Sequence, residues 1–208
     1  SGIHLVPYVR AALDRGAKLV VIDPRTTALA RAADVHLPVK PGTDVAVALA
    51  IHRFLFASGL ADSAFLRDHT RGAERLRERA EEWTIERAAS VADVDPLALE
   101  QVASLYAESS PALIRCGWGL ERNRNGGSAA MAVLALPAGA GKFGGRGGGY
   151  SKSNSAPWNI DPAWSGCDEP DPPIANTNSL GRALTGHDDP SVNVLFLSNC
   201  NPPASLPE

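Results

Sequence analysis

Apolar and polar positions in the first part of the chain alternate between the helical and the strand pattern. Residues 5–13 carry an apolar helical face, and Gly16 follows where a helix end favours a left-handed residue. Residues 19–22 form a continuous apolar run rich in β-branched side chains, which is typical of a parallel strand buried on both faces. A short helix through Ala33 and a second strand at 35–39 are predicted next.

The pattern after this second strand predicts a buried helix. Pro41-Gly42 has turn chemistry, and Thr43 or Asp44 suits the N-cap of a helix whose residues 45–51 are apolar on every side. Helices and strands that alternate through loops of about 2–6 residues are typical of an α/β fold. We therefore predict a doubly wound, mostly parallel sheet with helices on both faces, of the dinucleotide-binding type.

The middle of the chain is helical and more polar. Residues 73–83 have an apolar stripe opposite a run of mixed charges, which we interpret as a solvated helix face. Asp95-Pro96 supplies an N-cap and a proline at the first helical position, and residues 112–116 follow as a third buried strand.

From residue 117 onwards glycine and proline interrupt the pattern. A helix is predicted at 128–136, ending before Pro137, and a short helix and a fourth strand are predicted at 180–184 and 192–197. We expect an α/β cofactor-binding domain at 1–142 with a helical section at 60–110, a Gly/Pro-rich irregular segment at 143–178, and the start of a second α/β domain at 179–208.

Composition and charge limit the kinds of partner that the chain is expected to bind. A formal net charge of −3 with mixed signs favours neither a nucleic acid nor an anionic membrane surface as partner. The longest apolar run is far shorter than the ~20 residues of a membrane span. The only methionine is internal, so we expect an internal piece of a longer protein. Three widely spaced cysteines favour a reducing compartment, hence slightly the cytoplasm, but the localisation itself stays open.

Three strand ends carry polar or glycine-rich turns, where ligands of a parallel sheet bind. After the first strand, the carboxylate of Asp23 suits a ribose diol. Arg25 and Thr26 or Thr27 suit a phosphate through charge-assisted hydrogen bonds. After the second strand, Asp44 can accept two parallel hydrogen bonds from a guanine, or act as a plain helix cap. Spacing alone favours the cap.

The third strand end is a glycine-rich turn that runs from Gly117 to Gly127. Its glycines allow a ligand to approach the backbone, and its two arginines attract anions. The chain otherwise contains no recognisable catalytic residues and no metal site. Residues 139–142 resemble the end of a phosphate-binding loop, but Leu136 stands where that loop needs glycine and Phe143 where it needs serine or threonine. His187-Asp188-Asp189 is interpreted as a solvated loop. No C-x-x-C pair is present, so an iron–sulfur cluster within this segment is not expected.

Taken together, the turns resemble the molybdopterin oxidoreductases of the dimethyl sulfoxide reductase family. The similarity begins with Ile-Asp-Pro-Arg-Thr-Thr at 22–27, Ala-Asp at 33–34 and Pro-Gly-Thr-Asp at 41–44. It continues through Gly-Trp-Gly at 117–119 with Asn-Gly-Gly at 125–127, and through the glycines of 141–149. It reappears in Asn-Ser-Leu-Gly-Arg-Ala-Leu at 178–184 and Leu-Ser-Asn-Cys-Asn-Pro at 197–202. The order and spacing of these pieces make the resemblance specific, and it covers nearly the whole chain.

The resemblance implies a bis-molybdopterin guanine dinucleotide cofactor carrying molybdenum or tungsten, held between two related α/β domains. It implies that residues 23–27 hold the ribose and phosphates of one dinucleotide and that 42–44 hold its guanine. It further implies that the turn at 116–120 lies near the pterin and that residues at 199–201 lie near the second cofactor. The cofactor-binding residues expected are Asp23, Pro24, Arg25, Thr26, Thr27, Gly42, Thr43, Asp44, Cys116, Gly117, Trp118, Gly119, Asn199 and Asn201.

The chain also departs from the family pattern. No residue matches the cluster-binding cysteines or the metal-ligating residue that the family carries upstream, so an iron–sulfur cluster could belong only to the parent protein. The resemblance implies two-electron redox or oxygen-atom transfer on a small-molecule substrate by the parent, with its remaining domains and an electron-transfer subunit as partners. The fragment alone is not expected to be active.

Two alternatives stay open: a non-catalytic scaffold relative of this fold, and a different nucleotide-binding domain of the thiamine-diphosphate-enzyme type.

Overall fold

The computed structural model describes residues 3–152, 180–186 and 192–197. The chain divides into two compact units, Ser1–Pro157 and Trp158–Glu208. In the second unit the described residues comprise one helix, α9 (Leu180–Gly186), and the segment 192–197, which has neither helix nor strand. The sequence prediction of a helix near 180 is therefore confirmed.

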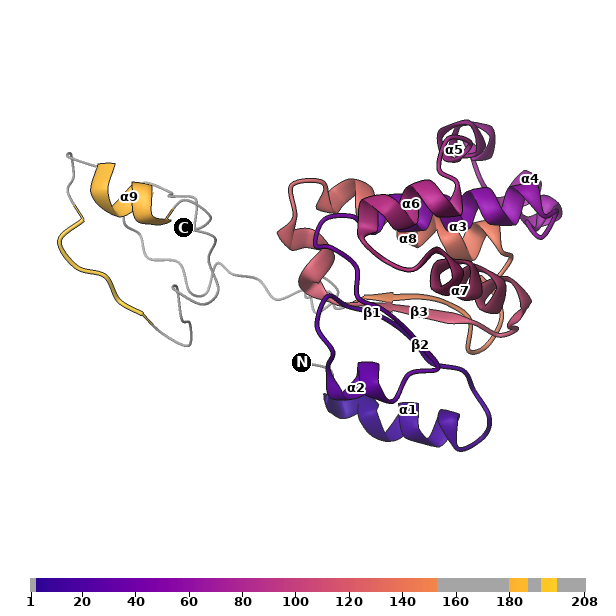
Figure 1. Cartoon of the computed structure of the whole chain (residues 1–208), viewed down its shortest axis with the longest axis horizontal. Helices are drawn as coiled ribbons and strands as arrows, with labels where there is room; N and C mark the ends of the chain where they lie inside the picture. Colours follow the sequence, from indigo (N-terminus) through magenta and orange to yellow (C-terminus); the bar gives the residue numbers. More distant parts are fainter. Residues whose placement is uncertain (1–2, 153–179, 187–191, 198–208) are drawn as a thin grey trace, which may run out of the picture. The chain divides into compact units, whose positions relative to one another are not determined.

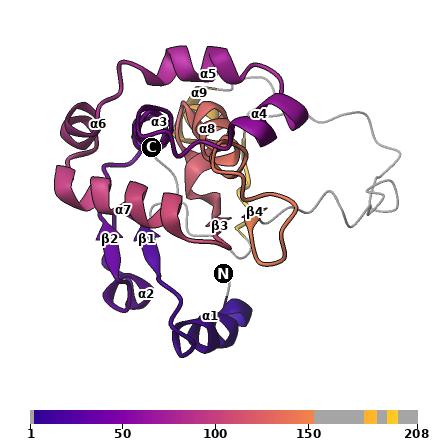
Figure 2. The ribbon, with the colours of Figure 1, turned by 90° about the vertical axis from the view of Figure 1, so that its right-hand side faces the viewer.

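Two pairs of parallel strands form the sheet structure of the first unit. β1 (Val20–Ile22) pairs with β2 (Val35–Leu37), with Val20 opposite Val35. β3 (Leu113–Cys116) pairs with β4 (Gly149–Lys152), with Cys116 opposite Lys152. The four strands follow one another in the order β2, β1, β3, β4 in Figure 2, and the described residues hold no hydrogen-bonded pairing of β1 with β3.

Helices lie on both sides of the β1–β2 pair. On one side are α1 (Val6–Leu13), preceded by the 3₁₀-helix η1 (Ile3–Leu5), and α2 (Ala28–Arg31). On the other side the helices form the bulk of the unit (Figures 1 and 2). They are α3 (Asp44–Ala57), α4 (Ser63–His69), α5 (Ala73–Ala80), α6 (Ile85–Ala92), α7 (Pro96–Glu108) and α8 (Gly126–Gly139). A 3₁₀-helix, η2 (Trp118–Arg122), links β3 to α8.

The hydrophobic core is built around α3, which is the helix that the sequence predicts to be buried. Ala50 and Leu55 of this helix are fully buried, and α3 contacts α5, α6, α7 and α8. Small side chains let these helices approach closely, since Ala88, Ala89 and Ala92 of α6 are buried in the same cluster.

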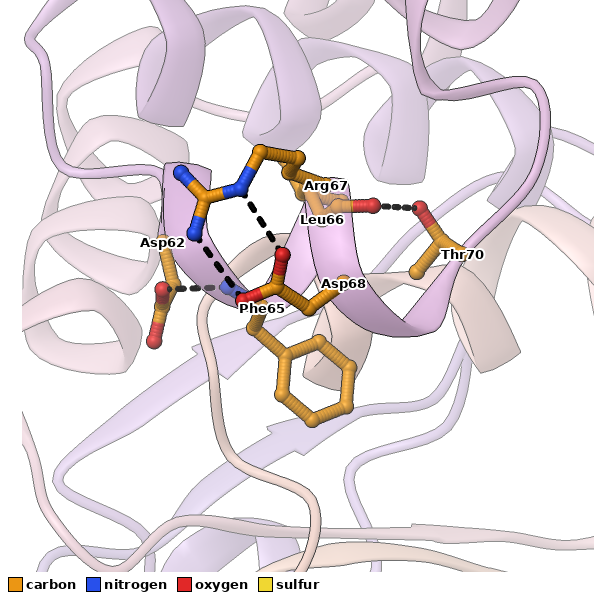
Figure 3. Close-up of polar contacts among 6 residues, drawn as sticks. All are labelled: Asp62, Phe65, Leu66, Arg67, Asp68 and Thr70. Atoms are coloured by element: carbon orange, nitrogen blue, oxygen red, sulfur yellow. Dashed lines mark hydrogen bonds and ion pairs between the residues drawn. The ribbon is translucent and has the colours of Figure 1, made fainter.

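Helix α4 is fixed at its first turn to the end of α8. The carboxylate of Asp62 accepts a hydrogen bond from the backbone N–H of Phe65 at 2.8 Å and so caps α4 (Figure 3). The N–H of Asp62 donates to the carbonyl of Gly139 at 2.9 Å. Arg67 pairs with Asp68 through two hydrogen bonds of 2.7 and 2.9 Å on the exposed side (Figure 3).

The structure confirms a mixed α/β fold with parallel strands and corrects three details of the sequence prediction. The fourth strand is Gly149–Lys152, inside the segment expected to be irregular, because glycines with positive φ angles at 147 and 149 lead the chain into it. Residues 192–197 form no strand, since all six are exposed and no strand of the described residues pairs with them.

The third correction concerns α8, which runs past Pro137 to Gly139 instead of ending before the proline. A proline removes only one hydrogen bond in the last turn of a helix, and this ring is buried against the core.

Candidate functional site

The turn after β1 is held by its own side chains. One carboxylate oxygen of Asp23 accepts a hydrogen bond from the backbone N–H of Arg25 at 2.8 Å. The hydroxyl of Thr27 accepts from the N–H of Ala30 at 3.1 Å and caps α2. His36 on β2 contacts the carbonyl of Asp23 through Nε2 at 2.9 Å. The turn is thus preformed, and Pro24, Arg25 and Thr26 are exposed on it.

The turn between β2 and α3 presents a half-buried carboxyl group. Gly42 has a φ of +85°, which favours glycine, and the hydroxyl of buried Thr43 donates to the carbonyl of Lys40 at 2.6 Å. Thr43 occupies the N-cap position of α3 and Asp44 is the first helical residue, so the interpretation of Asp44 as the cap is wrong. Burial raises the pKa of the Asp44 carboxyl, and its own backbone N–H opposes that rise.

The third predicted site segment starts at the end of β3 with a buried thiol. Burial raises the pKa of Cys116, which also shares a hydrogen bond with Tyr150. Burial also raises the pKa of Tyr150, to about 12. The carboxylate of Asp44 raises the pKa of this thiol further, while the ammonium group of Lys152 lowers it. Burial thus favours the protonated form of the Cys116 thiol.

The aromatic ring of Trp118 faces outward at the start of η2. It is 45% exposed, so Trp118 is not part of the core of this unit. The ammonium group of Lys152 lies 6.0 Å from the ring centroid and pairs with the carboxylate of Glu121. The ring thus offers a flat surface bordered by a cation and an anion.

The glycines of this loop fall into two groups. A Cβ added at Gly117 or Gly119 would meet no atom within 4 Å, and neither residue has a positive φ. A Cβ at Gly126 would lie 2.9 Å from the Cα of Glu121, so the packing of α8 against η2 requires that glycine. Open space over Gly117 and Gly119 is the feature expected of a backbone that a ligand approaches closely.

Two asparagines, Asn123 and Asn125, join the second and third turns. The side-chain amide of Asn125 donates to the carbonyl of Gly42 at 2.8 Å, across 83 residues of sequence. The amide of Asn123 donates to the carbonyl of Gly119 at 3.3 Å. A Cβ added at Gly42 would lie 3.4 Å from Oδ1 of the same side chain. Asn125 belongs to the Asn-Gly-Gly piece of the family resemblance, whereas no sequence pattern singles out Asn123.

The remaining predicted residues lie in other segments of the chain. The Asp23–Thr27 turn lies at the carboxyl end of the adjacent strand β1, and Asn199 and Asn201 lie outside the described residues. Lys142, in the sequence that resembles the tail of a phosphate loop, has a structural partner instead. Its ammonium group donates to the carbonyls of Ala107 and Ser109 at 3.1 and 2.6 Å, at the end of α7.

Within the described segments no three side chains of the metal-ligating types gather into one group. No helix of these segments has the length and apolar character that crossing a bilayer requires.

Comparison with known proteins supplies relatives along the whole chain. It is 36% identical over 214 residues to the probable oxidoreductase YoaE of Bacillus subtilis (strain 168), covering 100% of this chain and 31% of that protein. It is 31% identical over 129 residues to formate dehydrogenase H of Escherichia coli (strain K12), covering 62% of this chain and 18% of that protein.

A solved structure resembles the fold as well. The acetylene hydratase from Pelobacter acetylenicus superposes with a TM-score of 0.63 at 34% identity, over 65% of this chain and 19% of that one. The chain thus spans less than a third of the length of these relatives. The model of the family described as molybdopterin oxidoreductase matches residues 4–202, and the chain therefore belongs to the molybdopterin oxidoreductase family.

Proposed function

We propose that this chain binds one guanine dinucleotide of a bis-molybdopterin guanine dinucleotide cofactor, within a larger molybdenum- or tungsten-dependent oxidoreductase. The observation that carries the proposal is the contact between the Gly42–Asp44 turn and the loop that contains Gly117 and Gly119. A half-buried carboxyl group and an open glycine backbone thereby lie on one linked surface, at the carboxyl ends of parallel strands.

The carboxyl group of Asp44 fits a guanine. Burial disfavours its ionised form, and its own backbone N–H is the one hydrogen-bond donor that acts on its pKa. A guanine offers N1–H and an amino group as two parallel donors, which would stabilise the carboxylate as a bidentate acceptor. An adenine has no such pair of donors on the matching edge, so Asp44 would select the base.

The other residues fit the remaining parts of the cofactor. Arg25 and Thr26, exposed beside Asp23, would bind the phosphates and ribose. Gly117 and Gly119 would admit the pterin end close to the backbone, with the face of Trp118 shielding it from water. Asn199 and Asn201, in the second unit, would contact the second dinucleotide.

When bound, the cofactor supplies a two-electron redox centre. The residues of this chain bind and orient it, while the metal-ligating residue and the substrate pocket belong to other parts of the complete protein. We propose the remaining domains, a small-molecule substrate and an electron-transfer subunit as partners. We further propose that the two strand pairs belong to one doubly wound sheet in the complete protein, because β1 and β3 each use only one edge within the described residues.

The experiment is to compare the complete enzyme with its Asp44→Asn variant for nucleotide released by acid. We expect the wild-type protein to release GMP and the variant to release about half as much. The amide removes the bidentate acceptor from one of two sites, and a lost charge-assisted hydrogen bond costs about 1.5–3 kcal/mol. AMP in place of GMP would favour a different nucleotide-binding domain. A folded wild-type protein with no nucleotide would contradict the proposal and favour the scaffold relative.

A further inference from the structure

The position of Gly42 depends on a residue far along the chain. The carbonyl of Gly42 accepts the amide of Asn125 at 2.8 Å in a partly buried contact. The start of the same turn is tied elsewhere, since the N–H of Lys40 donates to the carbonyl of Ala92 at 2.8 Å. The N–H of Thr43 donates back to Lys40 at 3.2 Å. Asn125 therefore ties the middle of this turn, at Gly42, to the start of α8, in addition to the bonds that Thr43 makes within the turn.

Asn125 does not perform the usual task of an asparagine at its position. It occupies the N-cap of α8, where a side-chain oxygen normally accepts a backbone N–H of the first turn, yet it makes no such bond. Its amide is directed to Gly42 instead. The residue thus gives up local helix capping for a long-range contact, which points to a role in placing the Gly42 turn.

The backbone around Asn125 is held tightly enough to make it a firm anchor. The N–H of Gly126 donates to the carbonyl of Asn123 at 2.9 Å, and η2 leaves no room for a side chain at Gly126. Asn123 extends the link, because its side chain lies 3.4 Å from where a Cβ added at Gly42 would stand and donates to the carbonyl of Gly119 at 3.3 Å. The two asparagines thus connect the turn carrying Asp44 with the loop carrying the open glycines.

We propose that Asn125 is a positioning residue for base recognition: it fixes the Gly42 turn so that Asp44 meets the guanine while the η2 loop holds the opposite end of the same dinucleotide. The inference rests on the proposed function. It adds that the two binding segments are energetically coupled through this amide, since a shift of Gly42 moves the first turn of α3 and with it Asp44.

The test is a double-mutant cycle in the complete holoenzyme with Asn125→Ser and Asp44→Asn. Serine is as good an N-cap as asparagine but is too short to reach Gly42, so α8 keeps its start. The readout is the rate at which GMP, assayed after acid hydrolysis, is lost from the protein into excess buffer. We expect Asn125→Ser to lose it about tenfold faster, the effect of one hydrogen bond of about 1–1.5 kcal/mol.

The cycle separates positioning from mere stability. If Asn125 acts through Asp44, the double variant loses GMP no faster than the worse single variant, because the two changes remove one shared interaction. Fold-changes that multiply would overturn the proposal. Thr84→Ala removes the N-cap of α6 at the end of that helix opposite Ala92. It is the matched control, and it should lower Tm without changing GMP loss.

Two further results complete the test. If Asn125→Ser fails to fold, Asn125→Asp serves in its place, since it keeps the shape and N-cap ability but presents an acceptor to the Gly42 carbonyl. Unchanged GMP loss in either variant would refute the positioning role while leaving the guanine site intact. A wild-type protein without GMP would instead overturn the proposed function itself.

Discussion

At the scale of single residues, the burial of His52 could not be predicted from the sequence. Five scattered histidines carry no pattern that separates a core residue from a ligand. In the structure His52 is fully buried between α3 and α8, with Nε2 bonded to the carbonyl of Ala132 at 2.9 Å. Nδ1 has no hydrogen-bond partner in the described residues and faces Gly139. The ring is therefore a neutral core residue whose Nε2–H donates to Ala132.

The pKa of His52 makes the stability of this unit depend on pH. Burial lowers the pKa, and the bond to Ala132 opposes the shift. The unfolded chain takes up the proton near pH 6.5, while the folded one does so only at lower pH. The unfolding free energy should therefore fall as the pH drops below about 6.5, by at most about 1.4 kcal/mol per pH unit, until the lowered pKa is passed.

Urea denaturation of the chain at several pH values between 8 and 5 measures this slope. His52→Gln is the informative variant, because its amide can still donate to Ala132 but cannot take up a proton. We expect the variant to have a shallower loss of stability below pH 6.5 than the wild-type chain. Equal slopes in the two proteins would assign the pH dependence to other groups.

The residue scale also shows why part of the site could be predicted and part could not. Asp23, Gly42 and Asp44 follow strands whose apolar runs mark them in the sequence, so their place at strand ends is readable. The contact of Asn125 with Gly42 spans 83 residues, and no local pattern encodes such a distance. The burial that raises the pKa of Asp44 likewise arises only from tertiary packing.

At the scale of elements, strong local sequence signals predict helices and strands correctly, and weak signals do not. Asp95 caps α7 as predicted, and the all-apolar helix α3 lies at the centre of the core. β4 was missed because its sequence, Gly-Tyr-Ser-Lys, lacks the apolar run of a buried strand. Its hydrogen bonds to β3 stabilise the extended conformation, which the weak strand propensity of its own residues does not.

The segment from η2 to α8 allows a comparison of glycines within one element pair. Gly126→Ala places a methyl group against the backbone of η2 and should destabilise the fold by about 1–3 kcal/mol. Gly127→Ala, one residue later in open space, should stabilise α8 by about 0.5–1 kcal/mol. Gly117→Ala and Gly119→Ala should leave stability nearly unchanged but lower the retention of cofactor.

Denaturation curves and acid-released GMP from the four variants of the complete protein measure both effects. Gly126 and Gly127 serve as matched neighbours, because they share a helix and differ in the space around them. The difference between their two variants measures the effect of packing alone on the free energy of unfolding. Normal GMP retention by both Gly117→Ala and Gly119→Ala would remove these two residues from the proposed cofactor site.

At the scale of the whole molecule, the sequence predicted the class of fold better than its sheet. Parallel strands and helices on both sides of β1–β2 are present, but the described strands form two separate pairs. Long-range pairing between strands depends on contacts that a local pattern does not contain. The family assignment succeeded for a different reason: its motifs lie in turns, where backbone geometry and chemistry restrict the residue types.

The cofactor proposal can also be tested on the whole protein, by the molar ratio of GMP to metal. This chain spans less than a third of the length of these relatives. Its described residues link the two turns proposed to bind one dinucleotide, Gly42–Asp44 and Gly117–Gly119. A cofactor of two guanine dinucleotides around one metal requires a second set of residues, to which we assign Asn199 and Asn201. Metal analysis and acid-released nucleotide from the complete protein should therefore yield molybdenum or tungsten with GMP in about twofold molar excess. A ratio of one GMP per metal would mean that one pair of turns suffices and would withdraw the assignment of Asn199 and Asn201.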